Sequence, residues 1–139
     1  MMEQMTEMLI RRAAGVVNAR RIGERLVGDV GCALVTGQGN VYVGVCLDMA
    51  SGTGFCAEAS AIAAMVTAGE FRIRRIVAVW KDEQGRCYVL SPCGRCREFM
   101  RQMDEGNVET EVVLGGERVV KLWELLPDAD SFVPVEVDG

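Results

Sequence analysis

Three cysteines and one glutamate have the spacing of a catalytic metal site. Cys56 stands two residues before Glu58, and Cys93 and Cys96 form a Cys-x-x-Cys pair directly after Pro92. A catalytic zinc ion takes three protein ligands and leaves a fourth position for water, which a neighbouring carboxylate can deprotonate. We therefore predict one zinc ion per chain, bound by the three cysteines, with Glu58 as the catalytic proton carrier.

Both cysteine groups are expected at the first turn of a helix. Residues 56–69 are rich in alanine and end at a glycine, and Pro92 suits the entry of a second helix over residues 93–103. Unpaired amides and the helix dipole lower the thiol pKa at such positions. The alternative for a lone Cys-x-x-Cys is a buried or redox-active pair, but the second motif around Glu58 favours metal binding.

The sequence of 139 residues contains six cysteines and no histidine. The absence of histidine excludes Ser-His and Cys-His catalysis and every histidine metal ligand. The first residues lack the layout of a signal peptide, so we expect a reducing, cytoplasmic location in which disulfides do not form. We interpret Cys32 and Cys87 as buried small hydrophobic residues.

Length and composition predict a single domain over residues 1–139. Half of the residues are hydrophobic and only 6% are aromatic, which favours a core of aliphatic side chains. The net charge of −5 offers no basic surface for phosphates and argues against a nucleic acid polymer as partner. No apolar run reaches the roughly 18 residues of a membrane helix, so no membrane partner is expected. A small-molecule substrate is the remaining expectation.

Helices and short strands alternate along the chain. The spacing of apolar residues predicts an amphipathic helix over residues 3–26, with a break near Gly15 or Gly23. Strands over 30–35 and 41–46 predict a β-hairpin. The other expected elements are a glycine-rich loop over 48–55, the two zinc helices, strands over 75–81, 87–90, 109–114 and 118–120, and a last helix over 121–126. This order predicts a mixed sheet flanked by helices.

Four segments carry a resemblance to a known family. They are Cys56-Ala-Glu-Ala-Ser-Ala-Ile, Ile76-Val-Ala-Val, Leu90-Ser-Pro-Cys-Gly-Arg-Cys-Arg-Glu98 and Glu124-Leu-Leu-Pro127. Together they resemble the blasticidin S deaminases and the related small tetrameric cytidine deaminases of the zinc-dependent cytidine deaminase superfamily. The resemblance implies a three-layer α/β/α sandwich with a five-stranded mixed sheet. It also implies a homotetramer in which neighbouring subunits complete each pocket.

The same resemblance implies a reaction on an aminopyrimidine. Zinc-activated water attacks the ring carbon that bears the amino group of a cytosine, and Glu58 moves the protons so that ammonia leaves. The amide of Ala57 is expected to bind the ring carbonyl, and Ser91 the leaving amine. Relatives often carry an arginine directly after Cys-Ala-Glu where this chain has alanine, so Arg95 or Arg97 is the candidate to offset the thiolate charge.

The expected substrate wall departs from the cytidine pattern. Cys46 and Asp48 stand where nucleoside-specific relatives carry Asn-x-Glu to bind the ribose, and Gly28 stands where they carry a stacking phenylalanine. We therefore expect a modified cytosine nucleoside such as blasticidin S, bound in part by Cys46 and Asp48. Cytidine itself and another aminopyrimidine are the alternatives. A non-catalytic structural zinc protein is the alternative of another class, and the presence of Glu58 argues against it.

Overall fold

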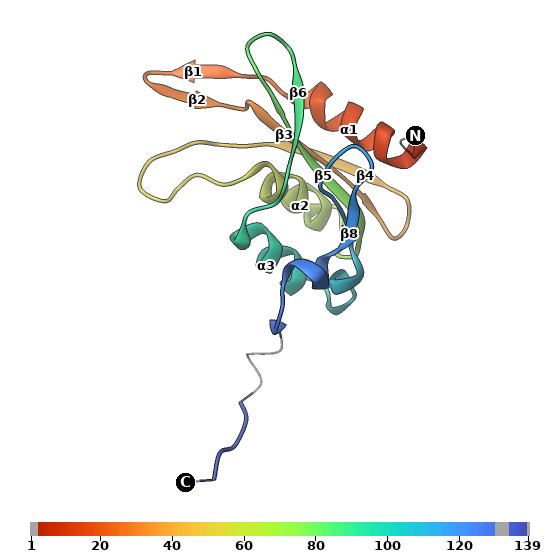
Figure 1. Ribbon diagram of the computed structural model, residues 1–139. Coiled ribbons are helices and arrows are strands. Elements are labelled where there is room, and N and C mark those ends of the chain that lie inside the picture. Colours follow the sequence, from red (N-terminus) through yellow and green to blue (C-terminus); the bar gives the residue numbers. More distant parts are fainter. Residues whose placement is uncertain (1–2, 130–133, 139) are drawn as a thin grey trace.

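Six strands form one mixed sheet in the computed structural model, which describes residues 3–129 and 134–138 (Figure 1). The strand order is β4-β3-β5-β7-β8. Strand β7 pairs with the first part of β5, and β6 pairs with the last part of β5. Strands β5 and β7 are parallel, and the other neighbours are antiparallel. The strands are β3 Val30–Thr36, β4 Val41–Val45, β5 Ile73–Lys81, β6 Cys87–Leu90, β7 Glu111–Val113 and β8 Val119–Lys121. The predicted mixed sheet is confirmed, with one strand more than the five expected.

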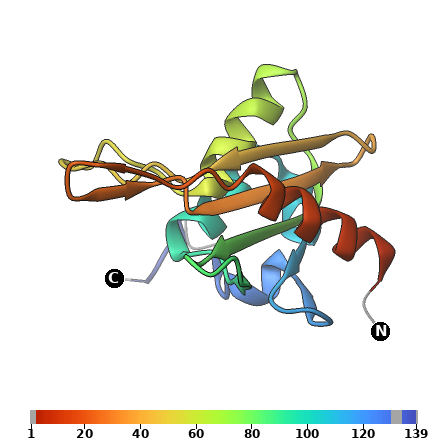
Figure 2. The same cartoon turned by 90° about the horizontal axis from the view of Figure 1, so that it is seen from above.

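Helices cover both faces of this sheet and give it three layers (Figures 1 and 2). The helices are α1 Gln4–Val16, α2 Ala57–Thr67 and α3 Gly94–Met103, with short 3-10 helices η1 Glu105–Glu109 and η2 Leu122–Leu125. Ala33 of β3 packs with Leu9 of α1, whereas the adjacent Leu34 packs with Ile62 of α2 on the opposite face. Alternation of side chains along the strand accounts for the two core layers. The predicted α/β/α sandwich is confirmed.

The helix predicted over residues 3–26 is correct only in its first half. Helix α1 ends at Val16, and the following residues form the antiparallel strands β1 Arg20–Ile22 and β2 Arg25–Val27. Gly23 lies in the turn with φ +62°, a left-handed conformation that glycine adopts without strain. The hairpin projects from the sheet (Figure 2). Apolar residues at helical spacing were misleading here because the turn at Gly23 reverses the chain.

Helix α2 lies directly against β4 because Gly44 has no side chain. A Cβ atom on Gly44 would lie 2.5 Å from the Ala61 amide nitrogen, which is closer than packed atoms allow. Ala57 and Ala61 are both buried on this helix. The close contact fixes the N-terminal end of α2, where Cys56 lies, against the sheet.

The cysteines outside the metal motifs differ in burial. Cys32 is fully buried in β3, as expected. Cys87 is exposed, so its predicted burial is wrong. Cys87 is the first residue of the short strand β6, which pairs with β5 and whose residues are mostly exposed. In residues 3–129 and 134–138, no helix has the length and apolar character needed to cross a membrane.

Candidate active site

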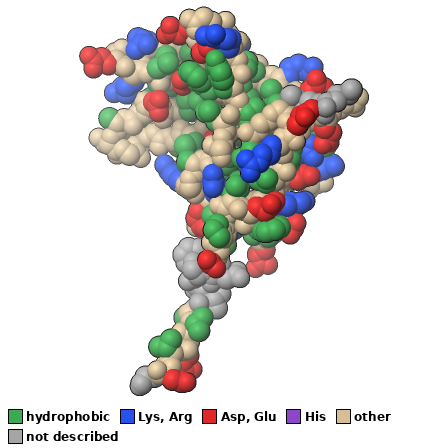
Figure 3. Space-filling view, in the orientation of Figure 1, with side chains coloured by type: hydrophobic (Ala, Val, Ile, Leu, Met, Phe, Trp, Pro, Cys, Tyr) green, Lys and Arg blue, Asp and Glu red, His purple; other side chains and the backbone are tan. Residues whose placement is uncertain are grey.

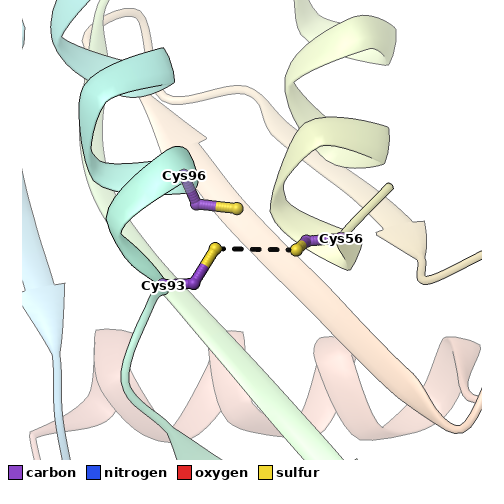
Figure 4. Close-up of side chains that lie close together, drawn as sticks. All are labelled: Cys56, Cys93 and Cys96. Atoms are coloured by element: carbon purple, nitrogen blue, oxygen red, sulfur yellow. Dashed lines mark hydrogen bonds between the residues drawn. The ribbon is translucent and has the colours of Figure 1, made fainter. Parts of the chain in front are cut away.

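The three cysteines of the metal motifs converge at the N-terminal ends of α2 and α3 (Figure 4). Cys56 is the N-cap residue of α2, Cys93 is the N-cap residue of α3, and Cys96 lies in the first turn of α3. Their sulfur atoms all lie within 4.8 Å of one another, and the Sγ atoms of Cys56 and Cys93 are 3.7 Å apart. Two segments far apart in the sequence thus bring three thiols to one point.

The spacing of the sulfurs fits a tetrahedral zinc ion. Ligands at the usual Zn–S distance of about 2.3 Å lie roughly 3.8 Å apart in a tetrahedron. The 3.7 Å between the Cys56 and Cys93 sulfurs agrees with this value. Soft thiolate ligands also suit zinc better than magnesium or calcium. The cluster can therefore hold one metal ion, and its chemistry fits zinc.

The thiol pKa values show why the cluster favours a cation. Burial raises the pKa of Cys56, and burial together with the nearby Glu58 raises the pKa of Cys96. Burial also opposes ionisation of Cys93, but the Cys96 amide and the neighbouring thiols lower the pKa of Cys93 overall. The surroundings thus favour ionisation of one thiol and oppose ionisation of the other two. A divalent cation supplies the positive charge that allows all three to become thiolates.

Glu58 lies in the first turn of α2, two residues beyond Cys56. Its side chain is buried, with 6% of the residue exposed, and burial raises the pKa of its carboxyl group. A raised pKa makes a carboxyl group a better proton acceptor, which suits a general base that later returns the proton. Glu58, Cys56 and Cys93 line the same cavity, so the carboxyl expected to carry the proton and the metal cluster face one space.

This cavity has a volume of about 530 Å³ and contains all the residues predicted for substrate binding. Cys46, Asp48, Ala57 and Ser91 each line it, together with Glu58. The fold therefore brings together predicted residues from the loop after β4, from α2 and from the segment before α3.

Arg97 holds the segment that leads into α3. Its guanidinium donates to the carbonyl oxygen of Pro92 at 2.8 Å, to the hydroxyl oxygen of Ser91 at 3.1 Å and to the carbonyl oxygen of Leu125 at 3.3 Å. Arg95 lines the main cavity, and it also borders a small hollow of about 30 Å³ together with Cys56 and Cys96. The two arginines proposed to offset the thiolate charge thus occupy different surroundings.

Gly28 cannot be replaced by an aromatic residue in this backbone. It has φ +82°, and a Cβ atom there would lie 2.6 Å from the Asn18 carbonyl oxygen. The Gly28 amide donates to the carbonyl oxygen of Cys46 at 3.0 Å. The glycine expected at the stacking position of the cytidine pattern thus lies in the backbone that joins β2 to β3.

Asp29 and Phe55 are among the lining residues that the motifs did not predict. Phe55 forms an antiparallel bridge with Leu47, with backbone hydrogen bonds of 2.9 and 3.0 Å in the two directions. This bridge closes the glycine-rich loop and places Phe55 in the wall of the cavity. Its place directly before Cys56 was the signal in the sequence that could have indicated it.

Comparison with known proteins agrees with this site. Residues 4–112 match the family described as "Cytidine and deoxycytidylate deaminase zinc-binding region". A cytidine deaminase of Mycobacterium tuberculosis is 33% identical over 101 residues, which are 72% of this chain and 71% of the relative. The crystal structure of a cytidine deaminase from Mycobacterium leprae matches with a TM-score of 0.71 at 29% identity, over 88% of this chain and 97% of that one. A cytidine deaminase structure from Burkholderia pseudomallei gives 0.70 at 33% identity, with the same coverage.

These relatives and the metal cluster define a zinc-dependent hydrolytic deaminase. More particularly, the chain belongs to the cytidine and deoxycytidylate deaminase family. The predicted zinc cofactor is confirmed at this level, because the domain is zinc-binding and the cysteine cluster can hold one metal ion. The predicted superfamily is also confirmed. The closer relationship to blasticidin S deaminases is a proposal.

Proposed function

We propose that this protein converts a cytosine nucleoside or nucleoside analogue to its uracil form and releases ammonia. The observation that carries the proposal is that buried Glu58 lines one cavity together with Cys56 and Cys93 of the three-cysteine cluster. Cys56, Cys93 and Cys96 would hold the zinc ion. When bound, zinc supplies Lewis-acid activation of water.

The residues of this chain carry the remaining steps. Glu58 takes a proton from the attacking water and delivers it to the ring nitrogen, then helps the amino group leave as ammonia. The Ala57 amide binds the ring carbonyl, and Ser91 binds the leaving amine. The hydrogen bond from Arg97 to the Ser91 hydroxyl supports this arrangement because it restrains the Ser91 side chain.

The proposed substrate is a modified cytosine nucleoside of the blasticidin S type. The backbone at Gly28 excludes the stacking aromatic of the cytidine pattern, and Cys46 and Asp48 replace the ribose-binding pair. Asp48 suits a substrate with a positive charge, although one exposed ion pair contributes only about 0.2–1 kcal/mol. Cytidine is the second candidate, because the relatives described above are cytidine deaminases.

Ammonia release across a panel of aminopyrimidines tests the proposal. Zinc-loaded protein is assayed with cytosine, cytidine, deoxycytidine and blasticidin S, and kcat/KM is compared side by side. We expect the highest value for blasticidin S. A value for cytidine equal to or above it would assign the second candidate. Absence of ammonia release from every compound, with zinc bound, would favour the non-catalytic alternative.

We also propose a cytoplasmic homotetramer that acts on a small molecule. Support comes from exposed hydrophobic residues around β6, where Figure 3 shows hydrophobic side chains gathered on one face. Trp80 and Tyr88 are stacked there with ring centroids 5.1 Å apart, and Leu90 is 37% exposed. Leu90 also lines the active-site cavity, so a neighbouring subunit on this face would help to close the cavity.

A further inference from the structure

Asp29 occupies a fixed position in the wall of the active-site cavity. It follows Gly28, whose amide donates to the carbonyl oxygen of Cys46, and its own carbonyl oxygen accepts a hydrogen bond from the Lys81 amide at 3.2 Å. The backbone at Gly28 and Asp29 is thus hydrogen-bonded to Cys46, directly after β4, and to Lys81 of β5. Its side chain is partly exposed and lines the cavity that contains Glu58.

The Cys46 thiol is hydrogen-bonded to the side chain of Asp29. It donates a hydrogen bond to the Oδ1 atom of Asp29 at 3.3 Å, and only 7% of Cys46 is exposed. Burial raises the pKa of Cys46, and the hydrogen bond to Asp29 raises it further, so the thiol keeps its proton. A protonated thiol here acts as a donor that orients the carboxylate.

The carboxylate of Asp29 has acceptor capacity left for a ligand. An ionised carboxylate offers about four lone-pair sites on two oxygens, and one thiol donor occupies one of them. The charged side chains lining the cavity are those of Asp29, Asp48, Glu58 and Arg95. With Glu58 beside the metal cluster, Asp29 and Asp48 are the acceptors available to the rest of a substrate.

We propose that Asp29 binds hydrogen-bond donors on the part of the substrate outside the pyrimidine ring, and that Cys46 is a positioning residue for its carboxylate. The inference rests on the proposed function, and it moves the substrate contact expected of Cys46 to Asp29. Sugar hydroxyls and an amino group on the sugar share this donor chemistry. Asp29 also borders a second cavity of about 510 Å³, which Trp80 and Tyr88 line.

Direct binding of product analogues tests the inference without turnover. The probes are uracil, uridine and 5′-amino-5′-deoxyuridine, titrated calorimetrically into zinc-loaded protein. For Asp29→Ala we expect the dissociation constant of at least one of the two nucleosides to rise about tenfold or more, as for loss of a hydrogen bond to a charged group. Uracil affinity should change less than about twofold, because uracil lacks the part that Asp29 binds. A larger loss for the amino compound than for uridine would identify an ammonium donor, and equal losses a hydroxyl donor.

The control variants separate binding from folding. Asp29→Asn keeps the side-chain size and should weaken nucleoside binding in the same direction, with zinc content and Tm near those of wild type. Cys46→Ala should weaken nucleoside binding, and Cys46→Ser should restore it because a hydroxyl can donate to Asp29. Glu24→Gln, an exposed change in the β1–β2 hairpin, should change nothing.

Three outcomes would overturn the inference. They are unchanged nucleoside affinity in both Asp29 variants, an equal loss of uracil and nucleoside affinity, and failure of the wild-type protein to bind either nucleoside. The ammonia assay is read separately. Ammonia release by wild type with unchanged nucleoside affinity in the Asp29 variants rejects only this inference. Asp29-dependent nucleoside binding without ammonia release rejects only the proposed reaction.

Discussion

The guanidinium of Arg97 lies 3.1 Å from the hydroxyl oxygen of Ser91 and donates a hydrogen bond to it. The same side chain donates to the carbonyl oxygen of Pro92, directly before Cys93. Arg97 therefore links the first turn of α3 to the segment that delivers a metal-motif cysteine and a proposed substrate contact. These hydrogen bonds hold the segment that leads to Cys93. This structural effect differs from offsetting the negative charge of the thiolates.

Replacing Arg97 should loosen this segment. We expect Arg97→Gln to lower zinc affinity or activity by about 10- to 100-fold, the usual effect of removing a group that orients a metal ligand. Zinc release to a chromogenic chelator measures the first, and ammonia release the second. Arg95→Gln is the matched comparison on the same helix, and we expect a smaller loss of zinc affinity from it. A greater loss in Arg95→Gln would assign the main supporting role to Arg95.

Replacing one cluster cysteine should remove the metal. We expect Cys93→Ser to lose most of its zinc and to have a lower Tm, because zinc binding contributes to the free energy of folding. Metal analysis after gel filtration and thermal unfolding are the measurements. Cys87→Ser is the control, since Cys87 is exposed and lies outside the cluster. Full zinc occupancy in Cys93→Ser would contradict the ligand assignment.

Glu58 should be needed for turnover but not for metal binding. We expect Glu58→Gln to retain zinc and the fold and to lose at least about 10²-fold in kcat, since the amide cannot carry the proton. Zinc content, circular dichroism and ammonia release are measured on the same preparation. Substantial activity in zinc-replete Glu58→Gln protein would show that another group moves the proton.

Glu70 should make stability depend on pH in the acid range. Hydrogen bonds from Thr36, Tyr42 and Asn40 lower the pKa of the Glu70 carboxyl below its usual value. Because the folded pKa is below the unfolded one, this stabilisation is present above the usual value of about 4.3 and is lost as pH falls through the lower folded value.

Urea denaturation of wild type and Glu70→Gln tests this expectation. The wild type should be the more stable protein near neutral pH, and the difference in free energy of unfolding should shrink below about pH 4.3. The Tyr42 hydroxyl donates to the Glu70 carboxylate at 2.6 Å. Tyr42→Phe removes this one donor and leaves the others, so it should show the same trend more weakly. A difference that stays constant into acid would rule out this role for Glu70.

The assembly should be a homotetramer. Sedimentation equilibrium at micromolar concentration is expected to give four times the mass of the 15.1 kDa chain. Tyr88→Lys places a charge on the exposed hydrophobic face around β6 and should reduce the mass, whereas Glu24→Gln should not. An active wild-type monomer would contradict the expectation that neighbouring subunits complete the pocket.

The sequence by itself determined the metal chemistry and the class of fold. Cys56 and Glu58 share one helix turn, as do Cys93 and Cys96, so local spacing was enough to predict each pair, whereas the fold brings the two pairs together. The order of strands and helices was likewise sufficient to predict a mixed sheet flanked by helices, and the resemblance to the cytidine deaminases implied the three-layer sandwich. Helical periodicity failed beyond Val16, where a turn replaced the expected continuation.

Only the tertiary structure decided the substrate wall. Asp29 reaches the cavity because the backbone at Gly28 hydrogen-bonds to Cys46, and Phe55 reaches it because the loop closes on Leu47. The hydrogen bond from Cys46, directly after β4, to Asp29, directly before β3, joins residues 17 positions apart. Such contacts depend on strand pairing and loop closure, which join segments distant in sequence, and local residue patterns do not specify which side chains meet.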